Sequence, residues 1–171
     1  GSVAKDSVGS NDGAVVGATW TPGLYGNALQ FDGIDDRVDL GTLDVPGSEI
    51  TLSVWVYGDN FYNCASGDCR IISKASGSSE GGHYWMLSTL YGDQLRFRLK
   101  TDGVTETLVG GSIAANTWTH VAAVYDGSAM RIYQDGTEVA VTAKTGAITQ
   151  APTVQAWIGD NPPTVGSRPW D

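Results

Sequence analysis

Short segments of β-type sequence recur along this chain roughly every 8 to 14 residues, separated by Gly, Asp, Asn or Pro. The chain contains 23 Gly and 15 Asp against only 4 Glu, and both abundant residue types favour tight turns. No segment shows a sustained apolar period of about 3.6 residues, which an amphipathic helix would require. The spacing therefore predicts an all-β protein built as a sandwich or a barrel.

The apolar alternation predicts about twelve strands. They are expected over residues 14–19, 28–31, 37–40, 49–57, 70–74, 83–90, 94–100, 106–109, 118–125, 130–134, 137–141 and 154–158. Asp135-Gly136 separates two of them and is a strong signal for a hairpin turn. Residues 52–57 and 118–125 are apolar on both faces, which predicts central strands with Trp55 and Trp118 in the core.

The size and charge of the chain exclude several classes of protein. A length of 171 residues predicts one domain. A net charge of −9 argues against nucleic acid as the partner, since phosphate neutralisation needs clustered cations. No apolar run reaches the roughly 20 residues of a membrane span.

The two cysteines, Cys64 and Cys69, are separated by four residues. This spacing differs from the C-x2-C pair of zinc and redox sites, and neither histidine lies near it in sequence. We therefore favour a Cys64–Cys69 disulfide over a metal site. A disulfide indicates an oxidising compartment, so we expect an extracellular or secreted protein.

Three segments occur together in a specific order: residues 26–40, 49–56 and 118–136, after an Asp- and Gly-containing start at residues 6–13. In order and spacing they resemble the laminin G-like jelly-roll domain of the concanavalin A-like lectin/glucanase superfamily. The resemblance implies one antiparallel two-sheet jelly roll over residues 1–171. Family members usually continue beyond the equivalent of Trp170-Asp171, so we expect the closing C-terminal strand to be absent.

No catalytic motif is recognisable. Hydrolases of this superfamily carry clustered carboxylates on one strand, whereas the four Glu here (Glu49, Glu80, Glu106 and Glu138) are scattered. We therefore expect that the chain is not an enzyme. The alternative is a polysaccharide lyase or glycoside hydrolase on the concave sheet face, in which His83 works with Arg96 or Arg98 and a Tyr.

Residues 94–100 place three cations, Arg96, Arg98 and Lys100, on one face of a strand. In one interpretation they face solvent and pair with neighbours such as Glu106. In the other, Arg96 and Arg98 hold the acidic groups of a glycan, because guanidinium forks match carboxylate and sulfate. Trp85 on the preceding strand would then offer a stacking platform for a sugar.

Two loops supply further candidate ligand-binding residues. The loop at residues 159–163 contains Asp160 and Asn161 and leads to Trp170, while Tyr62 lies in the disulfide loop. Loops carry recognition more often than strands do.

Four acidic residues are candidates for a structural Ca²⁺ site: Asp6, Asp12, Asp32 and Asp35. The resemblance implies an ion at the rim of the jelly roll, whereas the alternative is that these residues only cap turns.

These features favour a non-catalytic carbohydrate-binding module, tethered within a larger secreted protein such as a polysaccharide-degrading enzyme. The expected partner is a polysaccharide or another glycan, and glycans with acidic sugars are among the candidates. The first alternative is a cell-surface adhesion or protein-interaction module, and the second is the lyase or hydrolase described above.

Overall fold

The computed structural model describes residues 2–62, 64 and 67–171. No helix in this part of the chain is long and apolar enough to cross a membrane. Its elements, in chain order, are β1 (Val3–Ala4), β2 (Gly13–Val16), β3 (Thr19–Pro22), β4 (Asn27–Gln30), β5 (Arg37–Asp39), β6 (Ile50–Val56), β7 (Arg70–Ala75), the short 3-10 helix η2 (Glu80–Gly82), β8 (His83–Leu90), β9 (Gln94–Thr101), β10 (Val104–Ser112), β11 (Thr119–Tyr125), β12 (Ala129–Gln134), β13 (Thr137–Ala143) and β14 (Ala156–Ile158).

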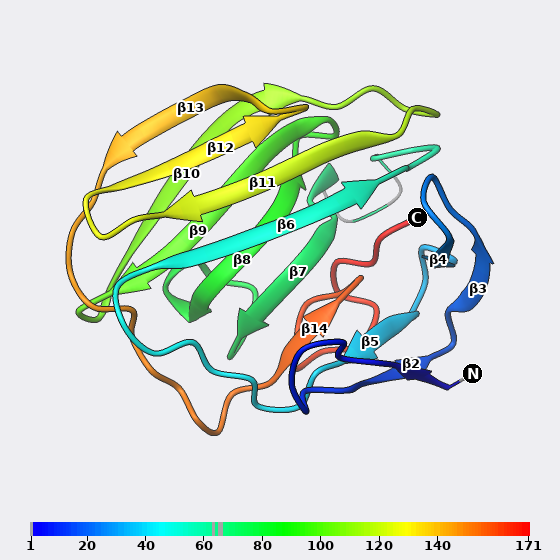
Figure 1. Cartoon of the computed structure of the whole chain (residues 1–171), viewed down its shortest axis with the longest axis horizontal. Coiled ribbons are helices and arrows are strands. Elements are labelled where there is room, and N and C mark those ends of the chain that lie inside the picture. Colours follow the sequence, from blue (N-terminus) through cyan, green and yellow to red (C-terminus); the bar gives the residue numbers. More distant parts are fainter. Residues whose placement is uncertain (1, 63, 65–66) are drawn as a thin grey trace.

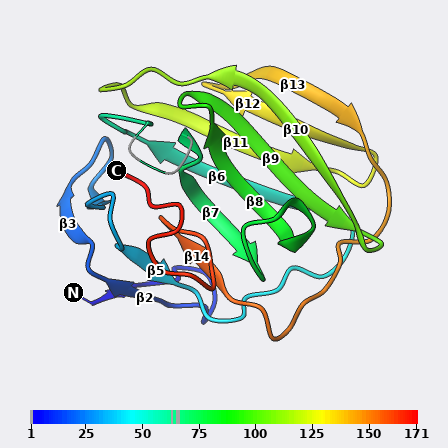
Figure 2. The ribbon, with the colours of Figure 1, turned by 180° about the vertical axis from the view of Figure 1, so that it is seen from behind.

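The strands form a sandwich of two antiparallel sheets (Figure 1). The larger sheet has the order β1-β2-β5-β14-β7-β8-β9-β10, and the smaller one has the order β13-β12-β11-β6. β3 and β4 pair only with each other and form a separate hairpin. Figure 2 shows the molecule from behind, with the larger sheet in front and the C-terminal segment beside β7 and β14. The predicted all-β sandwich is confirmed.

The core lies between the two sheets and follows from strict alternation along the strands. In β9, Leu95, Phe97 and Leu99 are completely buried against the smaller sheet, where Val121 and Ile132 face them. Burying each large apolar side chain stabilises the fold by roughly 1.5–3 kcal/mol. The same alternation sends the intervening cations of β9 to the opposite face.

The predicted turns form where Gly and Asp allow positive φ. Asp135 and Gly136 connect β12 to β13 with φ values of 50° and 80°. Positive φ at both central residues is typical of the type I′ hairpin turn. Tyr91 and Gly92, with φ values of 53° and 100°, lie with Asp93 in the three-residue loop that connects β8 to β9. The hairpin predicted at Asp135-Gly136 is confirmed.

Of the two strands predicted to lie in the middle of a sheet, β6 and β11, only β11 does so. β11 does lie between β12 and β6, but β6 pairs only with β11 and ends the smaller sheet. Trp55 is 40% exposed on β6, and Trp118 is half-buried. The prediction of a central β6 was wrong because its second apolar face borders a surface cleft rather than another layer.

Candidate functional site

The face of the larger sheet that points away from the core carries the predicted row of cations; we call it the outer face. Arg98 lies opposite Met86 of β8 and Thr107 of β10. Arg96 lies opposite Ser88 in the same sheet. Residues directly opposite each other in an antiparallel pair share a face, so these side chains surround the cation row.

A β-bulge in β7 adds Arg70 to the outer face. Arg70 lies opposite Ser88, whereas Ile72 lies opposite Leu87, so Ile71 is an extra residue in β7. An extra residue reverses the alternation of side chains beyond it. Without this bulge, Arg70 would point into the core together with Ile72.

A second irregularity brings His83 to the outer face. Trp85 lies opposite Lys74 and His83 opposite Ala75, so Tyr84 is an extra residue in β8. His83 and Trp85 therefore lie on opposite faces of the sheet, and the prediction that Trp85 is a stacking platform is wrong. Trp85 is 1% exposed and packs in the core opposite Leu99, where it offers no platform to a sugar.

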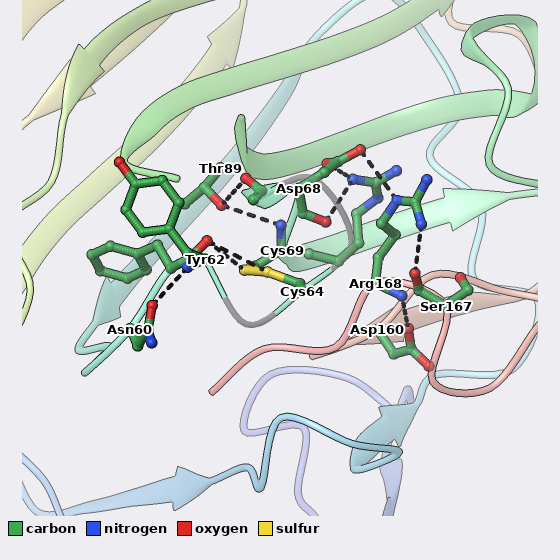
Figure 3. The surroundings of a disulfide bond; sticks show 12 residues. Asn60, Tyr62, Cys64, Asp68, Cys69, Thr89, Asp160, Ser167 and Arg168 are labelled. Carbon is green, nitrogen blue, oxygen red and sulfur yellow. Dashed lines mark hydrogen bonds and ion pairs between the residues drawn. A yellow bond between two sulfur atoms is a disulfide. The ribbon is translucent and has the colours of Figure 1, made fainter. Parts of the chain in front are cut away.

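Asp68 is the centre of the buried part of the outer face. Its Oδ1 accepts hydrogen bonds from Arg70 Nη1 and Arg96 Nη2, and its Oδ2 lies 3.3 Å from Arg168 Nε. Figure 3 shows the side chain of Arg168 reaching towards Asp68 beside the disulfide. The two strand arginines are only 0% and 3% exposed, so Arg96 is a buried ion-pair partner rather than the glycan contact predicted.

Burial lowers the pKa of Arg70 to about 10, and the nearby charges of Arg96 and Arg168 act in the same direction, while Asp68 opposes them. The guanidinium therefore remains charged at neutral pH. Three cations consequently share one carboxylate, and two of them, Arg70 and Arg96, are almost completely buried. Removal of this carboxylate would leave buried cations without a counter-charge.

The C-terminal loop is organised around the buried carboxylate of Asp160. Its oxygens accept backbone N–H bonds from Asn161, Gly166 and Arg168, over 2.7, 2.6 and 2.9 Å. Asn161 Oδ1 in turn accepts bonds from Arg70 Nε and Ser73 Oγ. Both predicted ligand contacts, Asp160 and Asn161, are at most 1% exposed, because they hold the loop on the sheet instead of facing solvent.

His83 lies between the buried arginines and Arg98. Its Nδ1 is 2.8 Å from the carbonyl oxygen of Ser79, and its Nε2 is 3.2 Å from Arg70 Nη2. Asn161 Oδ1 also lies 3.1 Å from Nε2. Since Ser79 O only accepts and the Arg70 guanidinium only donates, we assign the ring proton to Nδ1, which leaves Nε2 to accept from Arg70. Burial, followed by the charges of Arg70 and Arg98, lowers the pKa of His83 to about 4. The imidazole is therefore neutral at physiological pH.

Arg98 and Lys100 are the half-buried members of the cation row. Neither forms an ion pair with another residue described by the structure. Lys100 donates to the carbonyl of Gly81 and lies 4.4 Å from the ring centroid of Tyr84. Glu106, the partner suggested by the sequence, lies opposite Leu99 and so on the other face. The cation row thus combines a paired, buried Arg96 with two unpaired neighbours.

The remaining sequence-based candidates are the disulfide and two aromatic residues, Tyr62 and Trp170. Cys64 and Cys69 are bonded, with a Cα–Cα distance of 5.4 Å, as the sequence predicts. Tyr62 is 69% exposed beside that loop. Trp170 is 7% exposed and packs on Phe61 at a centroid distance of 5.7 Å, so the prediction of an exposed rim residue is wrong there.

An aromatic cleft of about 370 Å³ is lined by residues of β4 and β6. Trp20, Tyr25, Trp55 and Tyr57 line it, and each is at least 40% exposed. No charged residue of the described chain lines this cleft. The sequence indicates these aromatic residues but gives no sign that they gather at one place.

The acidic candidates divide between two places. Asp32 and Asp35 join Asp36, and one carboxylate oxygen from each of the three lies within 4.8 Å of the other two. Burial, and then the charges of the other two, raise the pKa of Asp36. Asp6 and Asp12 do not belong to this group: Asp6 accepts backbone N–H bonds from its own loop, and Asp12 pairs with Lys5.

Comparisons with known proteins agree with this architecture. A family model of the concanavalin A-like lectin/glucanases superfamily, of laminin G type, matches residues 32–171. Human pappalysin-1 is 29% identical over 138 residues, which span 75% of this chain but only 8% of that protein. The chain thus spans a small part of the curated relatives that it matches.

Two solved structures have the same fold at low identity. Domain 4 of AbnA, an extracellular arabinanase of Geobacillus stearothermophilus, gives a TM-score of 0.57 at 17% identity, covering 90% of this chain and 71% of that one. Domains LG4-5 of the mouse laminin alpha1 chain give 0.57 at 10% identity, covering 82% and 36%. The chain therefore belongs to the laminin G-like branch of the concanavalin A-like lectin/glucanases superfamily.

Proposed function

We propose that this chain is a non-catalytic carbohydrate-binding domain of a larger secreted protein, such as a polysaccharide-degrading enzyme. The fold supports this proposal, since structurally similar domains include one from AbnA that was solved with arabinotriose. Fold alone does not determine function, so the proposal depends on a site in this chain.

The observation that carries the proposal is the open part of the outer face. Thr105 and Thr107 of β10 lie opposite Lys100 and Arg98 of β9, and Tyr84 lies beside them. All five side chains are half-buried, so they are fixed in place yet reach solvent. Hydroxyl, cationic and aromatic groups together match the hydroxyls and apolar ring faces of a sugar.

A binding role fits this surface better than catalysis. His83 is 0% exposed and both of its ring nitrogens already contact protein groups, which leaves none to exchange a proton with a substrate. A general acid or base must reach the reacting group directly or through one water. We therefore rank the lyase alternative below the binding module.

Laminin G-like domains and disulfides are typical of extracellular proteins, and this chain has both features. Its match to 8% of pappalysin-1 is consistent with one module among several. A single module would bind weakly and act by raising the effective concentration of its tethered partner at the glycan.

Affinity electrophoresis tests the proposal. Native gels containing neutral, uronic and sulfated polysaccharides should retard the chain on at least one of them. Migration that is unchanged by every polysaccharide would contradict a carbohydrate-binding function.

The aromatic cleft favours a second candidate function, the protein-interaction module. In the part of the chain that the structure describes, no strand pairs with the second backbone edge of β6, beside the uncharged cleft. Such an edge can accept a strand from another polypeptide. Hydrogen exchange tests whether the edge is free: slow exchange at every β6 amide would contradict an available edge.

We also propose a structural Ca²⁺ at Asp32, Asp35 and Asp36, in place of the four-residue set predicted from the sequence. Carboxylate oxygens are the donors that Ca²⁺ prefers. The raised pKa of Asp36 fits three clustered carboxylates, whose mutual repulsion a cation would relieve.

A further inference from the structure

We propose that Arg98 and Lys100 form an anion subsite on the outer face, which holds the carboxylate or sulfate group of an acidic sugar. This inference rests on the proposed carbohydrate-binding function and names the chemical class of the ligand. It concerns the two cations that remain after Arg96 has been assigned to the buried ion-pair cluster.

Among the residues that the structure describes, part of the Arg98 guanidinium has no hydrogen-bond acceptor. Nε donates to Thr107 Oγ1 over 3.1 Å. Nη1 lies 3.4 Å from His83 Nδ1, but that nitrogen carries the proton donated to Ser79 and cannot accept a bond. A half-buried guanidinium with unused donors is a strong binding site for an anion, because guanidinium forks donate to carboxylate in a bidentate way.

Lys100 lies two residues along the same strand, about 6.6 Å from Arg98 at the backbone. Its ammonium group donates to Gly81 O and lies over the ring of Tyr84. An ammonium group has three donors, so this arrangement keeps capacity for a further acceptor. The two cations and the Thr107 hydroxyl can therefore approach one anionic group from different directions.

The local charge of the outer face opposes the charge of the whole chain. Five cations (Arg70, Arg96, Arg98, Lys100 and Arg168) accompany three carboxylates (Asp68, Glu80 and Asp160) among the described residues of this region. The complete chain carries a net charge of −9. A positive region that is set into an acidic protein attracts anions to that region and to few other places.

Glu80 is the internal competitor for this subsite. Its Oε1 accepts a 2.6 Å hydrogen bond from Thr107 Oγ1, the same hydroxyl that accepts from Arg98 Nε. Glu80 is exposed on η2, so its carboxylate can leave without disturbing the core. Removing this charge should strengthen the binding of an anionic sugar, which is an effect that a loss of folding cannot imitate.

Calorimetry with matched ligands tests the subsite. The ligands are oligogalacturonate, its methyl ester, which has the same sugar without the charge, and dextran sulfate. The unmodified chain should bind at least one anionic ligand roughly tenfold or more tightly than the ester at low salt, and the preference should fall as salt rises. Arg98→Gln should remove roughly tenfold of the affinity, since a hydrogen bond to a charged group contributes about that much.

Four further variants make the result specific. Lys100→Gln should weaken anion binding, Arg98→Lys should retain part of it, and Glu80→Gln should increase it. Lys5→Gln is the control, because it removes one cation that is exposed and paired with Asp12, away from this face. Thermal melts confirm that each variant is folded.

The outcomes separate the subsite from the proposed function. Equal affinity for the acid, the sulfate and the methyl ester, or no gain from Glu80→Gln, would overturn the subsite while leaving carbohydrate binding intact. Absence of binding to these ligands and to neutral polysaccharides would overturn both. Preference for dextran sulfate or for oligogalacturonate would support the subsite and identify its anion.

Discussion

Substitution of Asp68 by Asn is the sharpest perturbation of the buried ion-pair cluster. The amide keeps the size of the side chain but removes the charge that Arg70, Arg96 and Arg168 share. Arg70 has a lowered pKa of about 10 and stays protonated at neutral pH, so the variant buries uncompensated cations.

The expected cost is about 3–5 kcal/mol, the usual result of removing one partner from a buried ion pair. A chain of this size has a total stability of roughly 10 kcal/mol, so the loss would be a large fraction of it. The melting temperature should fall by roughly 10 °C. Urea unfolding followed by tryptophan fluorescence measures the difference directly.

Asp12→Asn is the matched control, because Asp12 forms an exposed ion pair with Lys5. That substitution should cost no more than about 1 kcal/mol. Adding Arg96→Gln to Asp68→Asn should recover part of the lost stability, since it removes one unpaired cation. The inference that Asp68 compensates the buried arginines would be refuted if Asp68→Asn cost less than about 1 kcal/mol of unfolding free energy. Strictly additive effects in the double variant would refute it as well.

The other predictions concern pH, the disulfide and calcium. Because burial lowers the pKa of His83 to about 4 from 6.5, the unfolded state binds the extra proton first, and stability should fall by on the order of 3 kcal/mol as pH drops from 6.5 to 4. His83→Gln should flatten that part of a urea-unfolding pH profile; an unchanged slope would contradict the assignment. Replacing Cys64 and Cys69 by Ser should lower the free energy of unfolding by about 2 kcal/mol, the chain-entropy value for so short a loop. An unchanged free energy in chemical unfolding would contradict a stabilising role of the disulfide. Calcium should raise the melting temperature and a chelator should lower it, with Asp35→Asn removing the response; a melt insensitive to both would exclude the ion.

Periodicity was sufficient to predict most of the sandwich. The alternation in residues 94–100 correctly separated core-facing Leu95, Phe97 and Leu99 from the cations of β9. Asp135-Gly136 identified the β12–β13 hairpin because few residues tolerate positive φ. β1 and β3 escaped prediction, since a two-residue strand and an exposed strand ending in Pro22 carry little apolar pattern.

The site was predicted less well than the fold. Two bulges, at Ile71 and Tyr84, bring Arg70 and His83 to the outer face, and one sequence gives no sign of a bulge. Trp85 follows the regular alternation with Leu87 and faces the core. Asp68 was overlooked as well, although its position next to Cys69 fixes it beside the sheet. The interactions of Arg96, Asp160 and Asn161 are spatial, so charge and loop position alone misassigned them to a ligand.

The most direct test of carbohydrate binding at the outer face is chemical-shift mapping by nuclear magnetic resonance. A glycan that retards the chain in affinity electrophoresis is titrated into isotopically labelled protein. The account predicts that the largest shifts occur at Tyr84, Arg98, Lys100 and Thr107, on β8 to β10. Shifts confined to the aromatic cleft around Trp55 and Tyr25, with none on β9, would contradict it.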